Sequence, residues 1–190
     1  MIARSLPLAL PLVLTTLVMT ACSSPNQVLI PPSDSVLRLR PLVGSLEIRD
    51  VSLPRYAAAD PIMIQAEDGT LREMRRAIWA DDPERGMTLQ LASTLATITG
   101  ARVAAEPWPF SQPADANVTV RIEQVLAQPD GLFHMTGQYA IAGQNGGLAD
   151  RAGPFDISVP LPDTGPTAVA TAQGQALTEL AETIARRIAR

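Results

Sequence analysis

The side chains best suited to acid–base chemistry in this chain are its single histidine and the carboxylates near it. His134 lies four residues after Asp130 and eleven after Glu123, so either carboxylate could orient the ring of a general base. Hydrolysis would also require a nucleophile, and the sequence has no strand–turn–helix signature such as G-x-S-x-G to supply one. The alternative is a histidine on a strand, with a solvated or hydrogen-bonded ring. The missing nucleophile motif favours this alternative, and we expect no enzyme activity.

A second group of acidic residues precedes a predicted helix. Asp81, Asp82 and Glu84 could bind a cation, but helix capping explains two of them more simply. Asp82 stands before Pro83, which suits a first helical position, and Glu84 lies near the positive end of the helix dipole. One histidine excludes a multi-histidine metal site, and because all 15 basic residues are arginine, a lysine Schiff base or P-loop is excluded too. We expect no metal and no cofactor.

The only cysteine, Cys22, follows a short apolar run and precedes a segment rich in serine and proline. Arg4 supplies a positive start, and the apolar run over residues 6–19 is shorter than the ~20 residues of a spanning helix, as in a secretory signal. The order Met19-Thr20-Ala21-Cys22 resembles a bacterial lipobox. We therefore expect cleavage before Cys22 and acylation of this residue, palmitate being one of the chains. A permanent membrane anchor, or a chance cysteine beside an ordinary signal peptide, are the alternatives.

Lipidation at Cys22 has consequences for location and composition. Each buried CH₂ contributes about 0.8 kcal/mol and one chain binds marginally, so three chains would hold the protein on a membrane. Ser23 follows the cysteine where aspartate would signal retention, which predicts the outer membrane, with the protein facing the periplasm. Removing 21 of the 190 residues leaves 169, and losing Arg4 changes the net charge from −4 to −5. A chain of 169 residues suits one domain, and its negative charge gives it no electrostatic attraction to nucleic acid.

Alternating apolar and polar residues predict short strands joined by tight turns. Asp68-Gly69 and Asn145-Gly146 are turn dipeptides, and Gly131 closes a third turn, because glycine adopts the positive φ that such turns require. One further strand is expected around residues 27–30. We divide the chain into a signal peptide over 1–21, a lipidated N-terminus and tether over 22–40, and one domain over 41–190.

Two amphipathic helices complete the predicted elements. The first follows Asp82 and ends at Gly100, and the second occupies the end of the chain. Each has an apolar stripe at helical spacing, formed by Met87, Leu91, Leu95 and Ile98 in the first and by Leu177, Leu180, Ile184 and Ile188 in the second. The order β-β-β-β-α-β-β-β-β-α predicts an α+β fold, with a mostly antiparallel sheet and both helices packed on one face.

Several short motifs occur in a characteristic order. They are Val51-Ser52-Leu53-Pro54, Tyr56, Pro61-Ile62, Trp79-Ala80, the helix from Pro83 and the later segment EPWPF at 106–110. In this order they resemble the ABC-type transport auxiliary lipoprotein family of PqiC-like intermembrane transport lipoproteins. The resemblance implies a non-catalytic lipoprotein of an MCE-type lipid transport system, docked at the membrane end of the MCE tube, often as a ring. The implied partners are an MCE-domain protein, an inner-membrane permease and further copies of the same chain.

Aromatic residues in predicted loops are the candidate contact residues. Trp108 and Phe110 lie among prolines, and Tyr56 lies in the segment RYAAADP. Large aromatics in loops are typical of partner or oligomer contacts. Packing in the core is the alternative, and it is the favoured interpretation for Trp79. A second functional hypothesis also stays open, namely a general outer-membrane assembly or scaffold lipoprotein with no direct lipid contact.

Overall fold

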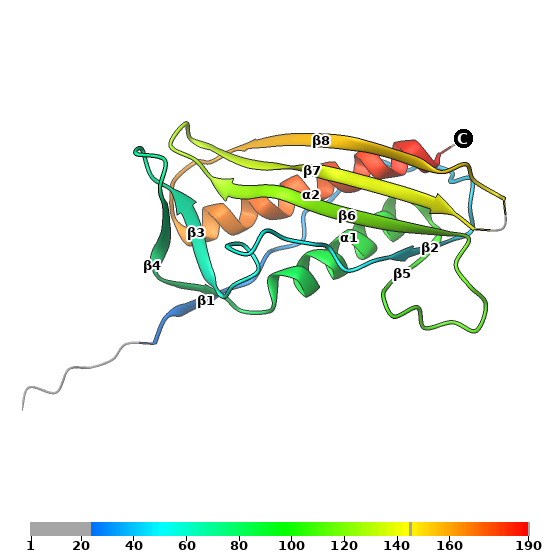
Figure 1. The fold of residues 1–190 in the computed structure, drawn as a ribbon, viewed down its shortest axis with the longest axis horizontal. Helices are drawn as coiled ribbons and strands as arrows, with labels where there is room; N and C mark the ends of the chain where they lie inside the picture. Colours follow the sequence, from blue (N-terminus) through cyan, green and yellow to red (C-terminus); the bar gives the residue numbers. More distant parts are fainter. Residues whose placement is uncertain (1–23, 145, 190) are drawn as a thin grey trace, which may run out of the picture.

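The computed structural model describes residues 24–144 and 146–189, so Cys22 and the predicted signal peptide lie outside the described residues. Within them the chain forms an α+β domain with eight strands and two helices (Figure 1). In chain order these are β1 (Asn26–Val28), β2 (Ser45–Ile48), β3 (Pro61–Gln65), β4 (Leu71–Trp79), α1 (Pro83–Thr99), β5 (Arg102–Ala105), β6 (Ala116–Ala127), β7 (Leu132–Gly143), β8 (Arg151–Pro160) and α2 (Pro166–Ile188).

The long strand β6 organises the sheet. Along one edge it pairs with β7 over its whole length, and β8 follows β7. Along the other edge it pairs with β2 near its start and with β3 near its end. β5 extends the sheet beyond β2, while β4 and then β1 extend it beyond β3. The sheet therefore splits into two arms along one side of β6.

The prediction of a mostly antiparallel sheet is wrong, because the sheet is mixed. Four of the seven strand pairings in the described chain are parallel: β1 with β4, β2 with β5, β2 with β6, and β3 with β6. Turn signals in a sequence reveal only hairpins, which are antiparallel by construction. The parallel pairs join segments that are far apart in the chain, so no turn residue marks them.

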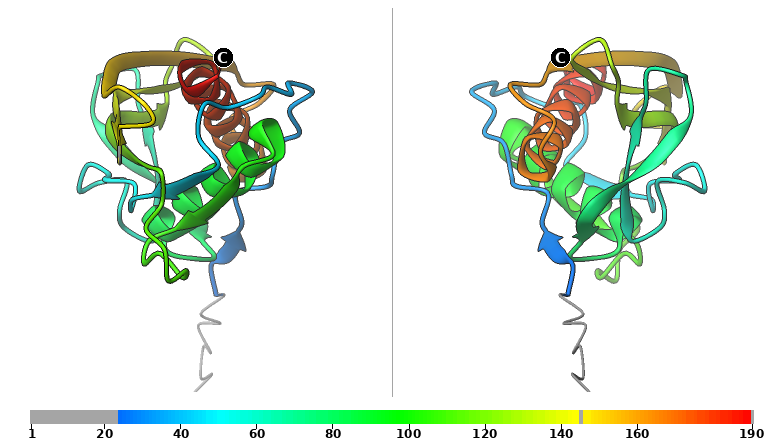
Figure 2. Two further views of the ribbon diagram at one scale, coloured as in Figure 1. Left: turned by 90° about the vertical axis from the view of Figure 1, so that its right-hand side faces the viewer. Right: turned by 90° about the vertical axis from the view of Figure 1, so that its left-hand side faces the viewer.

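Both helices lie inside the curve of this sheet, as Figure 2 shows along the long axis of the molecule. The predicted stripes are confirmed, since every one of their residues is at most 1 % exposed. α2 is further lined by buried alanines, which let it lie close to its neighbours. At Gly174 the helix meets the N-terminal segment closely, because a Cβ there would stand 2.3 Å from the carbonyl oxygen of Pro31. The core is thus one cluster between the sheet and the two helices.

The segment before β2 packs on the helices. The Ser35 hydroxyl donates to Glu182 (2.7 Å), the Thr178 hydroxyl donates to the Ser33 carbonyl (3.1 Å), and the Leu39 N–H donates to the Ile98 carbonyl (2.9 Å). β1 itself is the outermost strand of one arm. There is accordingly no packing boundary at residue 40, and the predicted tether is structured from β1 onward. Neither helix in the described part of the chain is long and apolar enough to cross a bilayer.

Candidate contact surfaces

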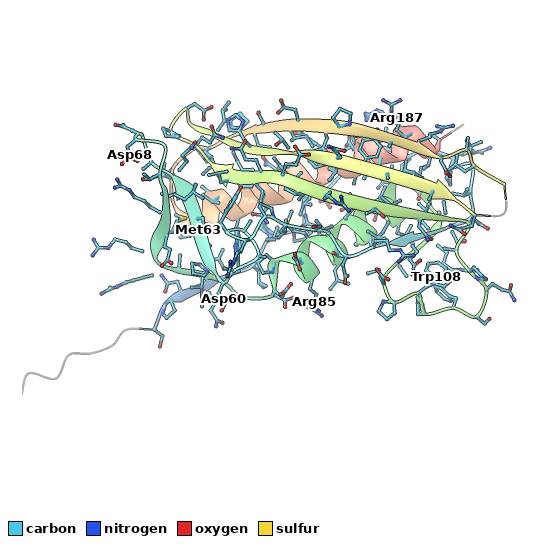
Figure 3. All side chains as sticks on the ribbon, in the orientation of Figure 1. Asp60, Met63, Asp68, Arg85, Trp108 and Arg187 are labelled. Atoms are coloured by element: carbon cyan, nitrogen blue, oxygen red, sulfur yellow. The ribbon has the colours of Figure 1, made fainter. Side chains whose placement is uncertain are left out.

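Two of the predicted contact residues lie in one loop between β5 and β6, residues 106–113, which we call the aromatic loop. Trp108 and Phe110 pack edge to face, with ring centroids 4.9 Å apart and an interplanar angle of 64°. The Trp108 indole N–H donates to the Gln112 carbonyl (2.7 Å), within the same loop. Phe110 is 44 % exposed. Figure 3 shows Trp108 in this loop, projecting from the end of the molecule opposite Asp68.

The base of the aromatic loop is fixed to the sheet. Arg49 and Glu106 form an ion pair (3.1 Å), and the Asp115 carboxylate accepts from the Gly44 N–H and the Ser45 hydroxyl, both at 2.9 Å. Three prolines within the loop restrict its backbone further. The aromatic pair is therefore held in one arrangement at the surface, without being part of the core.

Tyr56, the third predicted contact residue, lies far from this loop and has a different role. On the edge of β6 that faces the two arms, the Ile122 N–H donates to the Ser52 carbonyl (2.9 Å), and pairing with β3 begins at Ala127. Val125 lies in the gap between these two places. The Tyr56 hydroxyl fills this gap, accepting from the Val125 N–H (3.1 Å). Burial raises the pKa of the Tyr56 phenol, outweighing the opposite effect of this hydrogen bond. Its part in a partner contact stays a prediction.

A surface groove that the sequence did not predict runs beside β1. We call it the N-terminal groove; its volume is about 330 Å³, and its lining is mostly apolar. One wall is the segment 28–32 and the other is the outer side of α1, and Trp79 also lines the groove. The lining residues are Val28, Leu29, Ile30, Pro32, Trp79, Asp81, Asp82, Pro83, Gly86, Leu89, Gln90, Ser93 and Thr94. In the sequence, only Gly86 and Leu89 could have indicated this groove, because they lie off the buried stripe of α1.

The acidic group before α1 serves the helix, which confirms the capping interpretation. The Asp82 carboxylate accepts from the Arg85 N–H (2.9 Å), Pro83 is the first helical residue, and Gly100 ends the helix with φ of 65°. Asp81 pairs with the Arg85 guanidinium, and Glu84 accepts from the Leu53 N–H (3.3 Å). In residues 24–144 and 146–189 no three side chains of His, Cys, Asp or Glu gather as metal ligands would.

His134 has the hydrogen-bonded ring on a strand that the second interpretation predicted. Its Nε2 lies 2.7 Å from Asp130 Oδ2, and its Nδ1 lies 3.1 Å from the Ser158 hydroxyl, directly across the β7–β8 pair. The histidine holds the pKa of the Asp130 carboxyl below its usual value. A serine nucleophile works beside backbone donors at a turn or helix start, whereas Ser158 lies within β8. These hydrogen bonds therefore link the turn after β6 to strand β8.

Residues 30–185 match the family described as the ABC-type transport auxiliary lipoprotein component, and the chain belongs to this family. The expected resemblance is thus confirmed, and the chain is a transport auxiliary lipoprotein component by family.

Solved structures share the fold at low sequence identity. A crystal structure described as an uncharacterized protein has a TM-score of 0.72 and 17 % identity, covering 88 % of this chain and 100 % of its own. Protein XCC0632 from Xanthomonas campestris, of family DUF330, has a TM-score of 0.59 and 16 % identity, covering 85 % and 91 %. At these identities the likeness concerns the fold alone. No curated protein matches the chain significantly.

Proposed function

We propose that this protein is the lipid-anchored, non-catalytic component of an MCE-type intermembrane lipid transport system, acting at the outer-membrane end of the MCE tube. Membership of the transport auxiliary family is the observation that carries the proposal. The partners would be an MCE-domain protein and the inner-membrane permease. The lipobox before Cys22 and the serine after it support an anchor in the outer membrane, facing the periplasm.

The packing of the N-terminal segment supports a close attachment to the membrane. Asn26, where β1 begins to pair with β4, is the fourth residue after Cys22. An extended chain covers at most about 3.6 Å per residue, so an anchor at Cys22 would hold the domain within about 14 Å of the bilayer. A domain held so close suits a partner that must meet the membrane at a fixed place.

The aromatic loop supports a role in binding. Trp108 and Phe110 are large, held in one arrangement and partly exposed, as residues that dominate contact energies often are. We propose that this loop contacts further copies of the chain and that the protein works as a homo-oligomer.

Isolation of the native complex tests the proposal. The full chain, tagged at its C-terminus, is extracted from membranes under mild conditions, and its proteins and lipids are identified by mass spectrometry. We expect an MCE-domain protein, a permease and phospholipid. Recovery of outer-membrane assembly proteins without these partners would instead support the scaffold hypothesis.

The anchor needs its own control. Cys22→Ser should abolish labelling by a fatty-acid analogue and remove the protein from outer-membrane fractions. Equal labelling of the variant and the wild type would contradict lipidation at Cys22.

A further inference from the structure

We propose that the N-terminal groove is the docking site for the aromatic loop of a second copy of this chain, so that copies associate head to tail. This inference rests on the self-association in the proposed function and specifies the two surfaces that would meet.

The groove is an apolar surface left open by the fold. Leu29 on one wall is 67 % exposed and Leu89 on the other is 44 % exposed, while Trp79, which also lines the groove, is 9 % exposed and packs in the core. Its volume of about 330 Å³ is in the range of sites that hold a small organic group.

Gly86 gives an independent reason to regard the groove as a docking site. It lies in the first turns of α1, where glycine costs about 1 kcal/mol relative to alanine. A Cβ built at this position meets no atom within 4 Å, so nothing in the domain requires glycine there. Gly86 lines the groove, and any larger side chain would extend into it. The glycine therefore keeps open a space that the fold itself does not use.

The aromatic loop has the chemistry and the rigidity to fill such a space. Trp108 and Phe110 form a packed pair, and the indole N–H is already satisfied by Gln112, so the rings can enter an apolar site without leaving a donor unpaired. Because the pair is held before binding, little conformational entropy remains to be lost on docking.

One copy cannot place its own loop in its own groove. The groove lies beside β1 and borders α1 from Pro83 to Thr94, whereas the loop follows β5, beyond the C-terminal end of the helix, and its base is fixed to the sheet (Figure 1). The contact must therefore join two molecules through different surfaces. Such a contact repeats, and it gives a ring when the rotation between copies closes.

Charge favours this pairing over other apolar occupants. Asp81 and Asp82 lie at the groove, and Arg85 balances one of them. At the base of the loop the Arg102 guanidinium lies 5.0 Å from the centre of the Phe110 ring and forms no ion pair within the described residues. A docked loop would bring Arg102 toward this acidic rim, and complementary charge of this kind fixes orientation. If an acyl chain or an apolar partner helix occupied the groove, Arg102 would not approach the acidic rim.

Cysteine cross-linking in the full chain tests the contact directly, because Cys22 is the only native cysteine. Ser93 lines the groove, Ser111 lies in the loop, and both are exposed. Ser93→Cys with Ser111→Cys on one chain should give a ladder of oxidised oligomers in membranes. Each single variant should give none, and the two single variants co-expressed should give dimers only. As the matched control, Ser111→Cys with Thr119→Cys, which is exposed on β6, should stay uncross-linked.

The outcomes separate this inference from the proposed function. Assembled protein without a Ser93–Ser111 ladder would overturn the docking inference and leave self-association standing. Protein that is monomeric at all concentrations would overturn both.

Gly86 provides the second test. Gly86→Leu should fill the groove, fold normally and reduce the ladder at least tenfold, whereas Gly86→Ala, which adds a single methyl group, should raise the melting temperature and weaken the ladder less than Gly86→Leu does. A Gly86→Leu variant that cross-links like the wild type would overturn the inference. A Gly86→Leu variant that keeps the ladder but loses co-purified phospholipid would also overturn the inference, because the groove would then hold an acyl chain.

Discussion

Two loops of this domain carry an aromatic residue near prolines, and the fold uses them in opposite ways. Tyr56 turns toward the sheet, where its hydroxyl accepts from the Val125 N–H in the gap between the two arms. Trp108 bonds only to Gln112 in its own loop and leaves its partner Phe110 at the surface. The difference is set by the backbone nearby. Tyr56 packs inward because an N–H without a strand partner lies within reach of its hydroxyl. The Trp108 indole N–H already has an acceptor in its own loop, so its ring stays free for a contact.

The largest effect expected from this comparison is that of Tyr56→Ala on stability. Removing the half-buried ring leaves a void and an unpaired Val125 N–H, so the free energy of unfolding should fall by about 2–3 kcal/mol. Urea denaturation of the domain beginning at residue 24, followed by circular dichroism, measures the change. A loss below about 0.5 kcal/mol would mean that Tyr56 is a surface residue like Trp108.

Trp108→Ala should have the opposite profile, with assembly weakened and folding kept. Truncation of an aromatic anchor costs about 2 kcal/mol, or roughly 30-fold in the association constant. Sedimentation velocity reports the association, and circular dichroism is the folding control. A folded variant that assembles normally would remove Trp108 from the contact. An unfolded variant would instead show that its ring supports the core.

A smaller effect is expected for Tyr56→Phe, which keeps the ring and removes only the acceptor. The unfolding free energy should fall by about 1 kcal/mol, since the Val125 N–H loses its partner while packing is preserved. The same variant should assemble like the wild type. Impaired assembly with unchanged stability would place Tyr56 in the contact, as the sequence suggested.

The features that the sequence predicted correctly are local. The Asp82 cap, the first-turn Pro83 and the terminal Gly100 define α1 through neighbours in the chain, and Asp68-Gly69 marks the β3–β4 hairpin in the same way. The family resemblance was also correct, because its motifs follow one another over much of the chain.

The features that it missed depend on segments that are distant in the chain. The parallel pairings carry no turn signal, and the N-terminal groove joins residues 28–32 to a helix that begins at Pro83. In the segment before β2, Val28, Ile30, Leu37 and Leu39 pack against the core, and the serines and prolines among them hide this spacing in the sequence. Nothing near Tyr56 indicated that an N–H some 70 residues later would lack a strand partner.

The smallest effect, and the one most specific to the buried hydroxyl, is a dependence on alkaline pH. Burial raises the pKa of the folded-state Tyr56 phenol, whereas a tyrosine in an unfolded chain ionises near pH 10. Below pH 10 both states hold the proton, so the contribution of Tyr56 to stability is fully present. As the pH rises past 10 the unfolded chain loses its proton first, and this contribution is progressively lost until the folded phenol also ionises.

Urea midpoints of the wild type and Tyr56→Phe, compared between about pH 8 and pH 11, should therefore converge above pH 10. A difference that stays constant across this range would show that the Tyr56 phenol is as accessible as a surface residue, and the contrast with the aromatic loop would no longer hold.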